Sequence, residues 1–397
     1  MTSPNGLRAI PTDDRAWLHA ALADALAGGA PVLPVPADTP PETVSAVQGA
    51  ELPQGAALVI RTSGSTGTPK SVALSADALR SSAEATLEEL GGAGQWLVSL
   101  PTNLISGVQM LVRSIVAGTE PVFAPDRFDP EALLERAEEL DEGRRYVSLV
   151  PVQFTRLLDL AARDRDAAEA LRRFDAVLVG GQAMTLDLRR RAHELGVPLR
   201  RSYGMTETAG GCVYDGVEIG DTRVRIRGGE VQLAGSALAL GYVGDPARTA
   251  ERFIEEIGAD GAGSRWYRTG DAGELLGGML TVTGRLDRVI VSGGVNVSLD
   301  EVERAAREHA GWSSAVAIGS EHPEWGERVT LVVETEEGAA GFDEVKAAIR
   351  ERLGPAAAPV WVTETDRIPR LAGGKPDLPA IHAWIGMLRA SFKQTGA

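Results

Sequence analysis

The stretch Thr62-Ser-Gly-Ser-Thr-Gly-Thr-Pro-Lys-Ser71 follows the short apolar run 56–60 and precedes a helical pattern that opens near Ser75. Its small residues let backbone N–H groups approach a phosphate, and its one lysine supplies positive charge. It is not a Walker A loop, because two residues separate Gly67 from Lys70 and a Walker A loop has glycine and lysine adjacent. We therefore predict a phosphate-binding turn between a strand and a helix. The alternative is a flexible Gly/Ser turn without a ligand.

Bulk composition limits the kinds of partner that the chain can have. The 397 residues are 44% hydrophobic and 24% charged, which is ordinary for a globular protein of two or three domains. The net charge of −15 argues against nucleic acid or an anionic membrane as a main partner. We expect a cytoplasmic protein, since no signal-peptide pattern opens the chain and no apolar run reaches the roughly 20 residues that span a bilayer.

Cysteine and histidine give no sign of a metal centre. The single cysteine, Cys212, cannot form an intrachain disulfide or a thiolate cluster, and we interpret it as a small buried thiol. The five histidines are scattered and lack metal-ligand spacing.

Alternating strand and helix patterns run from residue 56 to about 203 and predict an α/β domain with parallel strands. Before it we expect a helix over 15–26 and an irregular or extended stretch over 31–41. The predicted strands of the alternating region are 57–60, 96–100, 121–123, 146–150, 176–179 and 199–202, and its clearest helices are 131–140 and 185–194.

The pattern changes twice beyond this region. Short strands between Gly-Gly turns over 222–291 predict an antiparallel β section, and renewed alternation from 298 predicts a small α+β domain. The predicted fold class is α/β, with a large N-terminal domain over 1–284 and a small, mobile C-terminal domain over 285–397.

Two segments in the large domain carry residues suited to a nucleotide. Residues 202–208 offer Tyr203 for stacking on a base and Glu207 for Mg²⁺, which prefers oxygen ligands shared with phosphates. Residues 266–271 end in Asp271, and a carboxylate at a strand end can accept the hydroxyls of a ribose. Taken alone, each segment is also explained as an ordinary turn or strand end.

Two further segments lie near and within the predicted small domain. Residues 284–296 carry Arg285 and the pair Gly293-Gly294, whose missing side chains permit close backbone approach or positive φ. Residues 368–377 place Lys375 in a Gly-rich loop, where it can bring a point charge to an anionic transition state. The ordinary explanations are an interdomain loop and a solvated lysine.

In this order and spacing, the five segments resemble the adenylate-forming superfamily of acyl-CoA synthetases, peptide-synthetase adenylation domains and luciferases, over roughly residues 55–380. The resemblance implies ATP, Mg²⁺ and coenzyme A as ligands. It implies catalytic roles for Lys375, Thr206 and Glu207, with Mg²⁺ at Glu207 and Thr66. The nucleotide residues that it implies are Thr62, Ser63, Gly64, Ser65, Thr66, Gly67, Lys70, Gly180, Gly181, Gln182, Tyr203, Gly204, Asp271 and Arg285. It also implies a hinge at Asp287 and a thiol channel at Gly293 and Gly294.

The early position of the loop, together with segments 100–114 and 203–216, is similar to the o-succinylbenzoate–CoA ligases of menaquinone synthesis in their compact actinobacterial form. Two departures are Ser71, where the superfamily usually has glycine, and Asn103-Leu104, where the compact form often has His-Tyr. The resemblance implies an ATP-dependent acid–CoA ligase and a homodimer. Its acid-binding residues would be Asn103, Leu104, Ser106, Arg113, Gly210 and Gly211.

For Arg113 there is also a chemical argument. o-Succinylbenzoate has two carboxylates and only one reacts, so the other needs a cationic or hydrogen-bonding partner in its pocket. A solvated helix arginine is the alternative reading of Arg113. Other functions that stay open are a different aryl or acyl-CoA ligase, a carrier-loading adenylation enzyme and a nucleotide-binding regulator without catalysis.

Overall fold

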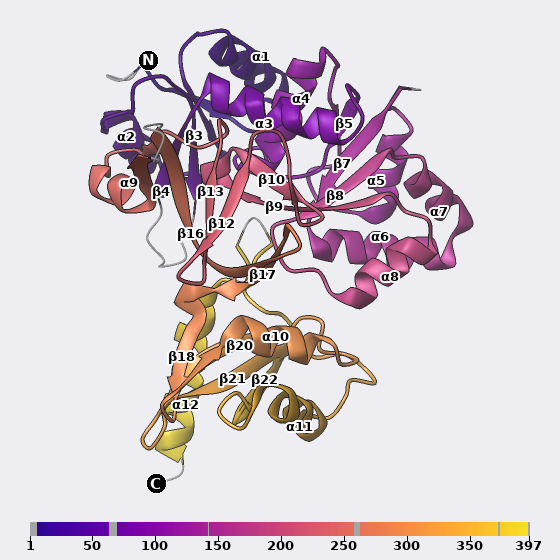
Figure 1. The fold of residues 1–397 in the computed structure, drawn as a ribbon. Helices are drawn as coiled ribbons and strands as arrows, with labels where there is room; N and C mark the ends of the chain where they lie inside the picture. Colours follow the sequence, from indigo (N-terminus) through magenta and orange to yellow (C-terminus); the bar gives the residue numbers. More distant parts are fainter. Residues whose placement is uncertain (1–5, 63–69, 142, 258–262, 372–373, 396–397) are drawn as a thin grey trace. The chain divides into compact units, whose positions relative to one another are not determined.

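The computed structural model describes residues 6–62, 70–141, 143–257, 263–371 and 374–395, with side chains as far as residue 388. The chain folds into two compact units (Figure 1). The first is Met1–Arg225, Gln232–Thr269 and Leu275–Leu280, and the second is Ile226–Val231, Gly270–Glu274 and Thr281–Ala397. The predicted domain boundary at 284/285 stays a prediction, since the two units interleave along the sequence.

The first sheet of unit 1 has the order β1-β2-β3-β4-β14. Its strands are β1 (Arg8–Pro11), β2 (Val32–Val35), β3 (Ala56–Thr62), β4 (Lys70–Ser75) and β14 (Gly241–Tyr242). β1, β2 and β3 are parallel, whereas β4 runs antiparallel to both β3 and β14. The stretch expected to be irregular or extended contains the extended strand β2, and α2 (Pro41–Gly49) follows it.

The stretch 62–71 follows β3 and leads into β4, which is antiparallel to β3. The predicted strand-to-helix turn is therefore wrong. Val72, Ala73 and Leu74 are fully buried and continue the sheet as β4 before the helix α3 (Ala76–Glu89) begins. The predicted start of that helix is confirmed, because the Ser75 hydroxyl caps it by accepting a hydrogen bond from the Ala78 N–H at 3.1 Å.

The second sheet of unit 1 confirms the predicted parallel α/β region. Its order is β11-β10-β9-β8-β7-β5-β6, and the pairs from β9 to β6 are parallel, while β10 and β11 add antiparallel strands at one edge. The strands are β5 (Gln95–Val98), β6 (Val122–Phe123), β7 (Arg145–Leu149), β8 (Ala176–Gly180), β9 (Leu199–Met205), β10 (Gly210–Tyr214) and β11 (Val217–Glu218).

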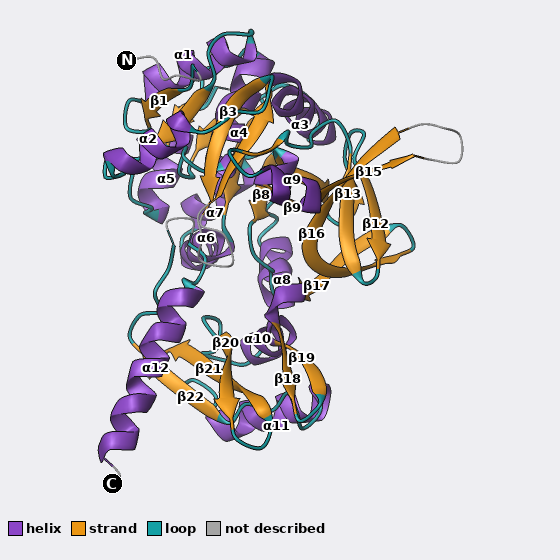
Figure 2. Ribbon diagram, turned by 90° about the vertical axis from the view of Figure 1, so that its left-hand side faces the viewer, coloured by secondary structure: helices purple, strands orange, loops and turns teal. Residues whose placement is uncertain are grey.

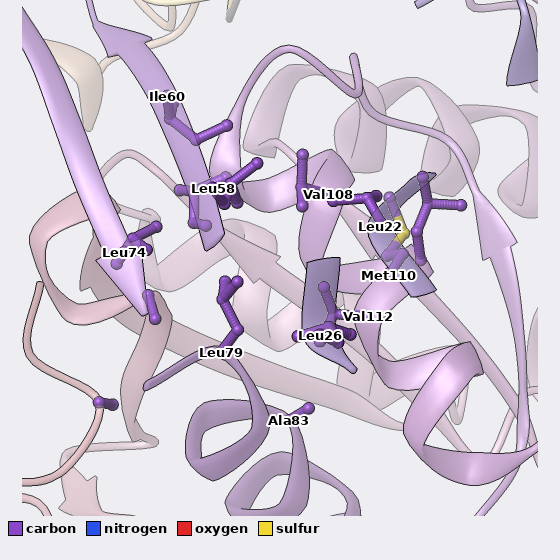
Figure 3. Packing of buried hydrophobic residues seen from close by; sticks show 14 of the residues in the cluster. Leu22, Leu26, Leu58, Ile60, Leu74, Leu79, Ala83, Val108, Met110 and Val112 are labelled. Carbon is purple, nitrogen blue, oxygen red and sulfur yellow. The ribbon is translucent and has the colours of Figure 1, made fainter. Parts of the chain in front are cut away.

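Helices cover these two sheets and form two hydrophobic cores. Figure 3 shows one core, in which side chains of α1, α3, α4, β3 and β4 gather. The second core contains side chains of α5, α6, α7 and α8 with β7 and β8. These helices are α1 (Arg15–Leu26), α4 (Ile105–Ala117), α5 (Pro130–Ala137), α6 (Pro151–Arg163), α7 (Arg165–Arg172) and α8 (Leu186–Glu194).

The predicted β section forms a third, five-stranded sheet. Four strands have the order β12-β13-β16-β15, and β17 pairs with β16. They are β12 (Arg223–Arg227), β13 (Glu230–Ala234), β15 (Phe253–Ile257), β16 (Gly263–Leu276) and β17 (Met279–Arg285). The helix α9 (Pro246–Arg252) precedes β15.

Unit 2 has its own sheet and core, which confirms the predicted α+β alternation (Figure 2). The strand order is β19-β18-β21-β20, with β22 parallel to β21. Its elements are β18 (Val289–Ser292), β19 (Val295–Ser298), α10 (Leu299–Arg307), β20 (Val316–His322), β21 (Gly326–Glu334), α11 (Phe342–Leu353), β22 (Trp361–Thr365) and α12 (Leu378–Thr395). None of the helices in the described ranges is long and apolar enough to cross a bilayer.

Candidate active site

The end of β9 and the short helix η1 (Thr206–Thr208) form the centre of the candidate site in unit 1. Glycine is required before the turn, because a Cβ on Gly204 would lie 2.0 Å from the carbonyl oxygen of Gly210. The Thr208 hydroxyl accepts a hydrogen bond from the Met205 N–H at 3.0 Å and lies 2.8 Å from the Gly210 carbonyl. Thr206 and Glu207, the first two residues of the turn, are buried.

Glu207 makes the main electrostatic contact of this turn. Its Oε1 lies 2.6 Å from Nζ of Lys70, at the start of β4, and accepts a hydrogen bond from the Tyr242 hydroxyl at 2.9 Å. Burial alone would raise the pKa of Glu207, but the Lys70 charge and the hydrogen bonds from Lys70 and Tyr242 lower it below its ordinary value. Glu207 is therefore a buried carboxylate that stays ionised at neutral pH.

Tyr242 and its aromatic neighbours support this pair. The Tyr242 ring lies 5.0 Å from Nζ of Lys70, and its own neighbour Phe253 packs against Tyr267 with ring centroids 4.9 Å apart. Burial, and next the Glu207 charge, raise the pKa of Tyr242 and of Tyr267, so both phenols keep their protons. Tyr242 has no sign in the local sequence, because it reaches Glu207 only through the pairing of β14 with β4 and no local motif marks that pairing.

Of the predicted phosphate loop, the structure places Thr62 at the end of β3 and Lys70 at the start of β4, where the two residues are paired across the strands. The other predicted loop residues, Ser63, Gly64, Ser65, Thr66 and Gly67, lie outside the described residues.

The predicted adenine-side glycines lie where β8 ends beside β9. A Cβ on Gly180 would be 2.8 Å from the Ser202 carbonyl oxygen, and Gly181 has a φ of +83°. Glycine therefore suits both positions for reasons of backbone geometry. Gln182 follows them, and the half-buried Tyr203 lies one residue beyond Ser202 on β9.

Four of the six predicted acid-binding residues lie on the helix α4 or just before it. Asn103 and Leu104 are half-buried just before it, Ser106 is exposed in its first turn, and Arg113 is buried at 4% exposure. The Arg113 guanidinium lies 4.7 Å from the centre of the Trp96 ring, and burial lowers its pKa. Within the described ranges no carboxylate pairs with it, and its Nε has no hydrogen-bond partner.

The predicted pocket glycines lie on β10. Gly210 has a φ of +115°, and an added Cβ there would lie 3.1 Å from Cγ of Gln109. A Cβ on Gly211 would lie 2.3 Å from the Ser202 hydroxyl and 2.7 Å from the Tyr214 ring. Both glycines therefore allow close packing of neighbouring side chains. Nearby on β10, burial raises the pKa of Cys212 to about 12, in agreement with an unreactive thiol.

Within unit 2, the structure brings together three predicted residues. Arg285 Nη1 lies 3.1 Å from Asp271 Oδ1, and its Nη2 lies 2.9 Å from Asp287 Oδ2. Burial alone would lower the pKa of Arg285, but the two carboxylates raise it. Asp271 is buried, whereas the predicted hinge residue Asp287 is exposed.

The remaining predicted residues of unit 2 lie in two tight turns. Gly293 and Gly294 have φ of +59° and +82° and connect β18 to β19, as positive-φ hairpin turns require. A Cβ on Gly293 would lie 2.6 Å from the Trp325 ring. The exposed Lys375 lies in a turn whose ends pair at Arg370 and Pro376, and its carbonyl accepts a hydrogen bond from the Leu371 N–H at 2.8 Å.

Binding of a metal ion such as Mg²⁺ depends on the side chains that the described residues bring together. They contain no cluster of three or more His, Cys, Asp or Glu side chains that could hold a metal ion. Mg²⁺ bound with a nucleotide takes one or two carboxylates and obtains its other ligands from phosphates and water. Glu207 is a fitting carboxylate of this kind.

The two-unit fold and the ion pair between Lys70 and the buried Glu207 fit the class of adenylate-forming enzymes. The chain belongs to the AMP-binding enzyme family: residues 31–252 match that family, and residues 301–375 match the AMP-binding enzyme C-terminal domain. The predicted superfamily is therefore confirmed.

The chain is also similar to individual members of this family. The chain is 36% identical over 341 residues, 84% of its length and 85% of the other's, to a Mycobacterium tuberculosis protein named "Probable 2-succinylbenzoate--CoA ligase". It is 26% identical to an Escherichia coli MenE variant with bound OSB-AMS, with a TM-score of 0.70 over 90% of this chain and 82% of that one. ATP-bound MatB from Rhodopseudomonas palustris shares the fold, with a TM-score of 0.78, 21% identity, and 94% and 87% of the two chains covered.

Proposed function

We propose that this protein is an ATP-dependent acid–CoA ligase that converts o-succinylbenzoate to o-succinylbenzoyl-CoA. The observation that carries the ligase assignment is the buried, ionised Glu207 beside Lys70, on the turn that follows β9. The substrate assignment is supported by the Mycobacterium tuberculosis relative and by the E. coli MenE variant with bound OSB-AMS.

The reaction has two group-transfer steps. First, a carboxylate oxygen of the acid bonds to the α-phosphorus of ATP and pyrophosphate leaves, which gives an acyl-adenylate. Then the sulfur of coenzyme A bonds to the acyl carbon, AMP leaves and the thiol proton is released. The first barrier lies in bringing two anions together, so positioned cations and hydrogen-bond donors are what the protein must supply.

In this proposal Lys70 and Glu207 exchange partners when the nucleotide binds. The Lys70 ammonium turns to the β- and γ-phosphates, and the Glu207 carboxylate helps to hold Mg²⁺. When bound, Mg²⁺ neutralises phosphate charge. Thr206, the residue before Glu207, would donate its hydroxyl hydrogen to the α-phosphate. Tyr242 would keep Glu207 in place during the exchange, because its hydroxyl donates directly to the carboxylate at 2.9 Å, whereas Nζ of Lys70 lies 3.5 Å from that hydroxyl.

Arg113 is our candidate for the carboxylate that does not react. A buried guanidinium with no carboxylate partner among the described residues is costly unless a ligand completes the site. A substrate carboxylate supplies that missing charge, and the low-dielectric surroundings strengthen the pair. We keep Gly210 and Gly211 as the acid-binding residues that the resemblance implies, although neighbouring side chains pack closely beside both glycines.

For unit 2 we keep the roles that the family resemblance implies. Asp271 and Arg285 would contact the ribose, and Lys375 would serve the first step. Rotation about Asp287 would then withdraw Lys375 and bring Gly293 and Gly294 to the thiol channel. We also propose a cytoplasmic enzyme that acts as a homodimer, with the large domain over 1–284 and the mobile domain over 285–397.

The test is pyrophosphate release from MgATP with a panel of carboxylic acids, with and without coenzyme A. We expect o-succinylbenzoate to give the highest kcat/KM, and a monocarboxylic aryl acid to react far more weakly. Release with another acid only would reject the substrate and leave a ligase of different specificity. Release without thioester formation would instead support carrier loading.

A further inference from the structure

The carbonyl oxygen of Ala209, directly after the Glu207 turn, accepts hydrogen bonds from side chains of two helices. Ser82 on α3 donates its hydroxyl at 3.0 Å, and Gln109 on α4 donates its Nε2 hydrogen at 2.6 Å. All three residues are buried, and Gln109 is only 1% exposed. A buried carbonyl with two side-chain donors is held more firmly than a turn carbonyl open to water.

This carbonyl belongs to a residue with an unfavourable backbone conformation. Ala209 has a φ of +51°, in the left-handed region that residues other than glycine rarely adopt. Its conformation sets the direction in which the chain leaves η1 for β10. Local strain of this kind persists only where neighbouring contacts enforce it, and Ser82 and Gln109 are such contacts.

Gln109 also connects the two halves of the proposed site. It lies one helical turn before Arg113 on α4, so the two side chains leave the same face of the helix. Its Nε2 reaches Ala209, two residues after Glu207. One short hydrogen bond therefore connects α4 to the turn that carries Glu207.

We propose that Gln109 is a positioning residue that, with Ser82, holds Ala209 in its left-handed conformation and so fixes the Glu207 carboxylate for MgATP. The inference rests on the proposed function and adds to it a link between the acid-binding helix and the nucleotide-binding turn. Gln109 acts through Ala209 and does not itself contact the reacting atoms.

Gln109→Met tests this link, because methionine keeps the length of the side chain and removes the donor. We expect MgATP binding by the acid-free enzyme, measured by calorimetry, to weaken roughly three- to tenfold, the effect of one hydrogen bond. The KM for MgATP should rise by a similar factor, while the KM for the acid changes less than twofold. Ser114→Ala is the matched control, since Ser114 is buried in the same helix and donates only to Met110.

A second substitution separates positioning from a general loss of packing. Glycine adopts the left-handed region freely, so in an Ala209→Gly background the loss caused by Gln109→Met should shrink to less than twofold. An unchanged loss in that background would overturn the proposal. So would a rise confined to the KM for the acid, which would make Gln109 a pocket residue. Calorimetry with MgATP alone keeps this test independent of the acid, so an error in the proposed substrate would appear separately.

Discussion

Nζ of Lys70 and Oε1 of Glu207 lie 2.6 Å apart. Lys70 belongs to the stretch 62–71 that resembles a phosphate loop, and Glu207 would help to hold Mg²⁺. Without nucleotide the two groups neutralise each other, so neither charge is left unpaired in a largely buried place. We infer that MgATP binding replaces one ion pair by two stronger charge contacts.

Replacing Glu207 by glutamine should leave the fold intact and greatly reduce adenylation. The amide keeps the shape of the side chain but has no charge for Mg²⁺, so we expect acid-dependent pyrophosphate release to fall by roughly a hundredfold, as for the loss of one key electrostatic group. Steady-state assays over a range of Mg²⁺ concentrations measure this effect. A variant within threefold of the wild-type rate would remove Glu207 from the mechanism.

The stability of the protein should depend on pH through Glu207. Its pKa in the folded state lies below its ordinary value of 4.5, so its stabilising contribution is fully present above about pH 4.5 and is lost as the pH falls through the folded-state pKa. Urea unfolding between about pH 3 and pH 7 should show a steeper loss of unfolding free energy in the wild type than in Glu207→Gln. Parallel curves would contradict the depressed pKa.

Tyr242→Phe should separate the role of the Tyr242 hydroxyl from that of its ring. The ring keeps its contact with Lys70, but Glu207 loses a donor, so we expect the unfolding free energy to fall by about 1–2 kcal/mol and the KM for MgATP to rise. Tyr146→Phe is a matched control, because its buried hydroxyl donates to the Leu90 carbonyl at 3.1 Å. It should lose similar stability without any change in the KM for MgATP.

Arg113→Met should change substrate preference more than stability. Methionine removes a buried charge that has no carboxylate partner in the described part of the chain, so the unfolding free energy should change by no more than about 1 kcal/mol. The KM for o-succinylbenzoate should rise at least tenfold, and that for a monocarboxylic aryl acid should hardly change. Arg172→Met, on α7, controls for loss of an arginine. Equal losses with both acids would argue against a role for Arg113 at the second carboxylate.

Lys375→Ala should separate the two half-reactions. The exposed lysine lies in a turn of unit 2 and, by our proposal, serves adenylation only. Pyrophosphate release should fall by two orders of magnitude or more, on the order of the effect of one transition-state charge. Thioester formation from supplied acyl-adenylate should largely survive. Equal loss of both steps would reject the proposed domain rotation.

Sequence patterns were sufficient where one local rule determined the structure. The parallel strands around β8 have continuous apolar runs, and the start of α3 follows from its Ser75 cap. The strand β4 was missed because its apolar run of Val72, Ala73 and Leu74 is too short to distinguish from the start of a helix. Only its antiparallel partners on both sides make it a strand.

The site was predictable to a similar degree. Motifs indicated Lys70 and Glu207 separately, and the structure joins them across 137 positions of sequence. Tyr242 and Ser82 lie in no motif, and Gln109 lies within segment 100–114 without being singled out there, because their importance arises from tertiary contacts. Arg113 was selected by the chemistry of a second carboxylate, and its burial without a described carboxylate partner gives that choice a physical basis.

The proposed ligase reaction is tested most directly by mass spectrometry of the products formed from MgATP, coenzyme A and o-succinylbenzoate. We expect o-succinylbenzoyl-CoA with AMP in equal amounts when coenzyme A is present, and o-succinylbenzoyl-adenylate when it is withheld. Hydrolysis of ATP with neither the adenylate nor the thioester formed would contradict it.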